Sequence, residues 1–164
     1  PVSKWHLVLG KILPFLFINF VQFALMFAVG YAILPRVTGL QLPMDFDIMG
    51  LTIVTLVCSM AATSYGLLVS CFAKTSEQAH AFGAFSIVIL AILGGVMVPR
   101  FVMPEFMQNA SMVSPLFWGL DSYLDLLVRK LPLVAVLPKV FLLAGFSVLA
   151  TVVSSLRFRW SEEH

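Results

Sequence analysis

Four long stretches of the sequence contain almost no charged side chains. Residues 12–34, 48–73 and 81–98 have no Asp, Glu, Lys or Arg, and residues 133–156 have one, Lys139. A helix of roughly 20 residues, rising about 1.5 Å per residue, crosses the ~30 Å hydrocarbon core of a bilayer. Because lipid offers the backbone no hydrogen-bond partners, segments that cross it in this way must be helical. The sequence therefore predicts an all-α transmembrane fold with four membrane-spanning helices.

The composition supports a membrane protein. Hydrophobic residues make up 60% of the chain and charged residues 11%, whereas soluble domains carry about 25% charged residues. The net charge of +2 is small and scattered, so we expect no nucleic-acid partner. The chain begins at Pro1 without an initiator Met or a signal-peptide pattern, and we expect it to be a piece of a longer polypeptide.

The segments between and beyond the spans differ in character. Residues 1–11 mix Lys and His with Trp and Leu, which predicts a short amphipathic segment leading into the first span. Residues 157–164 form a polar tail. Residues 100–132 are neither a clean span nor a soluble domain, and Pro104 and Pro115 each suit the first turn of a helix. We therefore expect a pair of short re-entrant or interfacial helices there.

Charged residues in the re-entrant segment follow a helical spacing. Asp121, Asp125 and Arg129 are separated by four residues each, so a helix places them on one face. We interpret this face as the polar side of an interfacial helix. A metal site on the two aspartates is disfavoured, because no His or third carboxylate has a fitting spacing.

Uncharged polar residues occur inside the spans. Asn19 and Gln22 lie one turn apart in the first span, where they either bond to another helix or line a substrate path. The second span carries small residues at a spacing that permits close helix packing, within this chain or across a dimer. The residues of this pattern are Ser59, Ala62, Thr63, Gly66 and Ser70.

Motifs for several chemistries are absent from the sequence. No G-x-x-x-x-G-K-[ST], H-E-x-x-H or G-x-S-x-G occurs, and the three His are isolated, which disfavours a membrane-embedded enzyme and leaves the chain without a P-loop. Lys139 lies near a span end, where it can extend toward the interface. An ion-coupled carrier is also disfavoured, because such carriers usually need carboxylates within the membrane.

The order of segments resembles a known family. The opening PVSKWHLVLGKILP, Gln22, the stretch KTSEQAHAFG, and GGVMVPRFVMPEFM followed by SPLFW resemble the permease domain of type-2 ATP-binding-cassette (ABC) exporters. The resemblance covers essentially the whole chain and corresponds to the C-terminal two-thirds or so of such a domain. It implies a six-span bacterial plasma-membrane permease whose first spans precede Pro1.

The resemblance also implies partners and sites. A separate ABC ATPase subunit would bind ATP and Mg, a second permease half would complete the pathway, and this chain would hold no cofactor. Contact with the ATPase would come from the cytoplasmic N-terminus, at Pro1, Val2, Ser3, Lys4, Trp5, Leu9 and Lys11. A gate on the outer side would involve Gly94, Gly95, Pro99, Met103, Pro104 and Pro115. We expect an amphipathic, lipid-like or drug-like substrate; the alternative is a membrane-anchoring or assembly subunit that transports nothing.

The four spans place both chain ends on one side of the membrane. Basic residues divide evenly between the two sides, so the positive-inside rule gives no orientation. The cytoplasmic N-terminus that the resemblance implies resolves this tie. It places residues 74–80 and the tail in the cytoplasm, and the re-entrant segment outside.

Overall fold

The computed structural model describes the backbone of residues 4–39 and 47–157, and their side chains except at positions 4–9, 11, 34 and 38. Within these residues the chain is helical and has no strands. The elements are α1 (Lys4–Thr38), α2 (Ile48–Phe72), α3 (Ser76–Leu93), a 3₁₀ turn (Arg100–Val102), α4 (Glu105–Ser111), α5 (Pro115–Leu127) and α6 (Leu133–Arg157). Helices α1, α2, α3 and α6 are long and apolar enough to cross a membrane, which confirms the four predicted spans.

Helix α1 joins the N-terminal segment to the first span without a break. It runs from Lys4 to Thr38, so the expected amphipathic segment and the span form one helix. Pro14 lies inside this helix, and Pro35 lies in its last turn. The helix passes the predicted end at residue 34 because Gly39, with φ of +67°, terminates it by donating its N–H to the carbonyl of Pro35 (3.0 Å).

Helix α3 begins and ends five residues earlier than the predicted span of residues 81–98. The Thr75 hydroxyl accepts a hydrogen bond from the backbone N–H of Gln78 (3.2 Å), and the Gln78 amide oxygen accepts one from the N–H of Lys74 (3.1 Å). Such reciprocal capping satisfies free N–H groups at a helix start. The polar residues Ser76, Glu77 and Gln78 therefore belong to the helix, and the chain turns away at Gly94.

The core lies where α2 and α6 meet. Leu51, Val54, Leu126, Val136 and Val140 form one buried cluster, with Leu126 contributed by α5. Further along the same contact, the Ser64 hydroxyl lies 2.9 Å from the hydroxyl oxygens of both Ser147 and Thr151. Apolar packing and interhelical hydroxyl bonds, the two forces that hold helices together in lipid, thus act on the same pair of helices.

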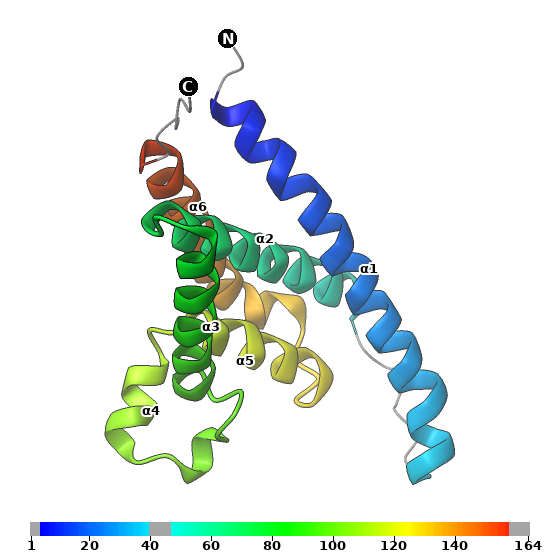
Figure 1. Cartoon of the computed structure of the whole chain (residues 1–164). Coiled ribbons are helices and arrows are strands. Elements are labelled where there is room, and N and C mark those ends of the chain that lie inside the picture. Colours follow the sequence, from blue (N-terminus) through cyan, green and yellow to red (C-terminus); the bar gives the residue numbers. More distant parts are fainter. Residues whose placement is uncertain (1–3, 40–46, 158–164) are drawn as a thin grey trace, which may run out of the picture.

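The remaining spans lie at the periphery of this core. In Figure 1, α1 runs along one side of the molecule and α3 along the other, with α5 between α3 and α6. Helix α3 has no buried residue in the structure. The first turn of α1 and the last turn of α6 lie at the same end of the molecule, while α4 lies at the opposite end (Figure 1). This arrangement agrees with both termini on one side of the membrane.

The arrangement predicts that two exposed polar positions lie on opposite sides of the membrane. Ser76 and Asn109 are both exposed, at the start of α3 and in α4, whereas the nearby Ser111 is fully buried and unsuited to labelling. With Cys58 and Cys71 replaced by Ser, we expect single cysteines at positions 76 and 109 to react with a membrane-impermeant thiol reagent from opposite sides. Reaction of both from the same side of intact vesicles would contradict this topology.

Candidate functional site

The residues expected to contact an ATPase lie at the start of the chain, where the structure describes only part of them. Pro1, Val2 and Ser3 lie outside the described residues, as do the side chains of Lys4, Trp5, Leu9 and Lys11. The backbone from Lys4 onward is helical and continuous with the span. Their role in coupling stays a prediction.

Most of the polar and small residues predicted to matter in the first two spans are exposed or half-buried in the structure. Asn19 is half-buried and Gln22 is exposed on α1. In the second span Ser59 is buried and Thr63 is half-buried, while the other three predicted packing residues are exposed: Ala62, Gly66 and Ser70. The contact with α6 is made by the neighbouring Ser64 instead. Packing of the exposed stripe against another helix stays a prediction.

The predicted gate glycines lie where the end of α3 meets the start of α5. A Cβ atom on Gly94 would lie 3.0 Å from Cβ of Leu116 and 3.1 Å from the backbone nitrogen of Phe117, so only glycine fits without displacement. Gly95 has a φ of +82°, which favours glycine. The Ser114 hydroxyl donates a hydrogen bond to the carbonyl of Leu90 (3.2 Å). The two helices are thus in direct contact at this turn.

The segment between α3 and α5 is held by its own polar contacts. Met103 is buried, and its carbonyl accepts a hydrogen bond from the Gln108 side-chain amide (2.8 Å). The Arg100 guanidinium donates to the carbonyl of Gln108 (3.3 Å) and lies 4.8 Å from the centroid of the Phe117 ring. Among the predicted prolines, Pro99 and Pro104 are exposed and precede helical turns, and Pro115 occupies the first turn of α5. The expected pair of short helices is α4 and α5.

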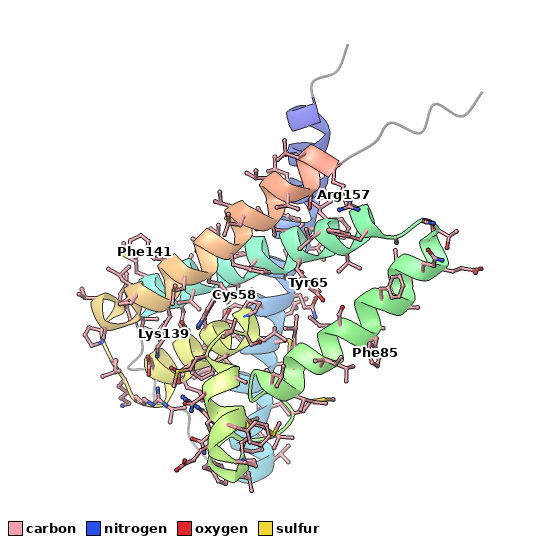
Figure 2. The ribbon with its side chains drawn as sticks, turned by 90° about the vertical axis from the view of Figure 1, so that its left-hand side faces the viewer. Cys58, Tyr65, Phe85, Lys139, Phe141 and Arg157 are labelled. Atoms are coloured by element: carbon pink, nitrogen blue, oxygen red, sulfur yellow. The ribbon has the colours of Figure 1, made fainter. Side chains whose placement is uncertain are left out.

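Four charged side chains connect α5 to α6. The Arg129 guanidinium lies 3.0 Å from a carboxylate oxygen of Asp121 and also bonds Asp125. The Lys139 ammonium of α6 bonds both carboxylates. Figure 2 shows Lys139 at the junction of α6 and α5. We call these four residues the charge cluster.

The charge cluster corrects two sequence expectations. The Asp121–Asp125 face was expected to be the polar side of an interfacial helix, but Asp125 is buried, with 4% of its side chain exposed. Lys139 was expected to extend toward the interface, but it turns toward α5 instead, because two carboxylates there satisfy its charge. Its partners are 14 and 18 residues distant in sequence, beyond any helical period.

The cations determine the protonation state of Asp125. Burial alone would raise the pKa of this carboxyl, but hydrogen bonds from Lys139 and Arg129 outweigh burial and lower its pKa. A lowered pKa means that the stabilising contribution is present above the ordinary Asp pKa of about 4 and is lost as the pH falls through the folded-state value. Asp125 is therefore ionised at neutral pH.

The same contacts bear on metal binding. Among the described residues, no group of three or more His, Cys, Asp or Glu lies close enough together to hold a metal ion. Lys139 and Arg129 already occupy oxygens of both aspartates, and their positive charge opposes a further cation.

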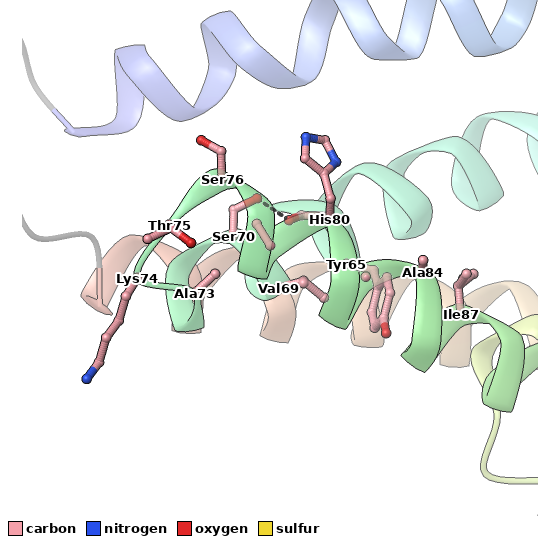
Figure 3. A pocket seen from close by; sticks show the side chains of 13 residues that line it. Tyr65, Val69, Ser70, Ala73, Lys74, Thr75, Ser76, His80, Ala84 and Ile87 are labelled. Carbon is pink, nitrogen blue, oxygen red and sulfur yellow. Dashed lines mark hydrogen bonds between the residues drawn. The ribbon is translucent and has the colours of Figure 1, made fainter.

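A cleft separates α2 from α3 near their shared turn. It has a volume of about 780 Å³ and is lined by polar residues close to the turn and by Tyr65 and Ile87 further along. Figure 3 shows that Lys74 and His80, the basic residues of this cleft, point in different directions. These two basic side chains therefore do not converge on one position in the cleft.

Comparison with known proteins identifies the family. The sequence matches the ABC-2 type transporter family over residues 1–128. The chain belongs to the ABC-2 type transporter family. It is also similar to YbhR of Escherichia coli strain K12, a probable multidrug ABC transporter permease, with 26% identity over 117 residues. YbhR of Escherichia coli O157:H7 is similar to the same extent. These matches cover 71% of this chain but only 30% of each relative. No solved structure matches significantly.

The charge cluster predicts a stability effect in this ABC-2 chain. Replacing Lys139 with Met leaves the buried Asp125 without its α6 partner. We expect the free energy of unfolding to fall by about 2 kcal/mol. This is less than the ~3–5 kcal/mol lost when a fully buried pair is broken, because 25% of the Lys139 side chain is exposed. Thermal unfolding in detergent measures this loss. Arg129→Met, at a side chain 51% exposed, is the control and should cost less. A larger loss for Arg129→Met would contradict the assignment.

The contact between α3 and α5 predicts a second effect. Gly94→Ala forces the helices apart, which typically costs about 1–3 kcal/mol in a packed site. The matched control is Gly145→Ala in α6, because a Cβ there meets nothing within 4 Å. We expect a lower Tm for Gly94→Ala and an unchanged or higher Tm for Gly145→Ala. Equal Tm values for the two variants would show that the junction is not tightly packed.

Proposed function

We propose that this chain is the C-terminal part of a permease subunit in an ATP-driven ABC exporter of the bacterial inner membrane. The observation that carries the proposal is the match to the ABC-2 type transporter family over residues 1–128. The four apolar helices are consistent with a transport domain. The name of the E. coli relative, a probable multidrug permease, supports an amphipathic, lipid-like or drug-like substrate.

The proposal assigns ATP hydrolysis to a partner. A separate ABC ATPase subunit binds ATP and Mg on the cytoplasmic side and contacts the N-terminal residues of this chain. Helix α1 continues from Lys4 into the membrane as one helix, with Pro14 inside it, so a displacement at its start can be carried into the span. A second permease half, identical or related, completes the pathway, and lipid surrounds both.

The proposal places the re-entrant segment on the outer side as a gate. Gly94 and Ser114 couple this segment to α3, and the charge cluster couples it to α6. Its movement therefore requires that one or both of these contacts rearrange. The alternative, an anchoring subunit, needs no such movement and predicts a stable complex without transport.

Trp5→Ala tests the coupling contact in the full-length permease. A buried aromatic anchor contributes about 2 kcal/mol at an interface, so we expect less ATPase to co-purify and substrate-stimulated ATP hydrolysis to fall about tenfold or more. The control is Phe15→Ala, an exposed aromatic residue further along α1. This variant should retain both co-purification of the ATPase and substrate-stimulated ATP hydrolysis.

The outcomes separate the two functions. If Trp5→Ala retains full ATPase association and full hydrolysis, the coupling assignment is wrong. If the unmodified protein co-purifies with an ATPase but drives no transport in vesicles, the anchoring role replaces the exporter.

A further inference from the structure

An apolar cavity lies between α2, α3, α5 and α6, next to the cleft of Figure 3. Its volume is about 370 Å³. Ligand pockets in proteins usually measure about 300–1,000 Å³, and an engineered cavity of about 150 Å³ already binds benzene. We call it the midplane cavity. It is large enough for a hydrocarbon ligand.

The walls of the midplane cavity are hydrocarbon. Apart from Cys58, Tyr65 and Tyr123, the described residues that line it have no polar side chain, and none is charged. Both tyrosine hydroxyls donate their hydrogens within the protein, Tyr123 to Thr55 (3.0 Å) and Tyr65 to Ser86. A polar ligand or an ordered water would therefore find few free partners there, and the walls favour an apolar one.

The position of the cavity indicates which apolar molecule reaches it. Ala62, Ile87 and Leu143 each lie near the middle of a spanning helix, so the cavity is at hydrocarbon depth. Its floor is buried at Ala61, Gly119 and Leu143. Its rim is exposed at Ala62, Ile87 and Val96. The rim lies at the same depth as the floor, where a ligand that enters from the bilayer presents a hydrocarbon chain.

Small residues determine the shape of the midplane cavity. A Cβ on Gly119 would lie 3.2 Å from Sγ of Cys58, so α5 approaches α2 closely at the floor. Ala61 and Ala62 line the α2 side of the cavity with short side chains that leave its volume open. Toward the shared turn, Tyr65 and Ile87 line both this cavity and the cleft, so the two spaces adjoin. A long flexible chain could extend from one into the other.

We propose that the midplane cavity binds one aliphatic chain, either a tail of a membrane phospholipid or the tail of a free amphiphile. Both present the same hydrocarbon chain at this depth, and they differ in the headgroup to which the chain is attached. The proposal is independent of the exporter function, because it requires only the four helices that form the walls.

The test uses photoactivatable chains and the full-length protein in membranes. One arm uses a phospholipid with a mid-chain diazirine and the other a free fatty acid with the same group, and mass spectrometry maps the adducts. We expect adducts on wall residues Leu120 and Phe146, competed by excess unlabelled chain. Exposed Phe141 of α6, which does not line the cavity, reports non-specific labelling. Wall adducts in the phospholipid arm identify a membrane lipid, and wall adducts in the fatty-acid arm alone identify a free amphiphile.

A cavity-filling variant makes the test specific. Ala62→Phe at the exposed rim should reduce wall adducts roughly tenfold, the effect of losing contact with about two methylene groups. Ala135→Phe, at an exposed alanine of α6 away from the cavity, is the matched control and should leave the adducts unchanged. Wall labelling no greater than labelling of Phe141 in both arms, or unchanged labelling in Ala62→Phe, would overturn the proposal.

Discussion

The contact between α2 and α6 supports the other elements. In lipid, helices gain nothing from burying apolar surface against each other, so their association depends on close packing and hydrogen bonds. Val54 and Val136 are almost fully buried at this contact, and the Ser64 hydroxyl reaches Ser147 and Thr151 across it. Helix α5 packs on the pair through Leu126. The ring of its Tyr123 stacks on the ring of Phe23 of α1, with 5.6 Å between the ring centroids. Helix α3, without a buried residue of its own, then contacts α5 at Gly94.

The spans were predictable because crossing a membrane is a one-dimensional requirement of length and charge. Their ends were less predictable, because local capping determines them. The Thr75 and Gln78 side chains begin α3 inside a polar run, and Gly39 rather than Pro35 ends α1. Pro35 lacks an N–H, but its carbonyl still accepts a bond, so a proline near a helix end does not by itself define that end.

The candidate site was also predictable from the sequence only in part. The spacing correctly predicted that Asp121 and Asp125 share a face, because helical period determines it, whereas Arg129 lies beyond the end of α5 and contacts both carboxylates with its side chain. The partner of that face could not be predicted, since it depends on how α6 lies against α5 in three dimensions. The small residues of α2 show the same limit: their spacing indicates a surface for close approach, yet in this chain Ser64 and not Gly66 meets α6. Periodicity describes a face but does not say which element covers it.

The composition of the charge cluster has an electrical consequence. Two carboxylates and two cations sum to zero, and they are linked so closely that they move together. A single unpaired charge crossing a membrane potential of 100 mV involves about 2.3 kcal/mol of work. A neutral quartet that moves as one unit involves none, so the membrane voltage exerts no net force on the charge cluster itself. Displacement of the cluster as a unit thus depends on the contacts that α5 and α6 make with neighbouring helices.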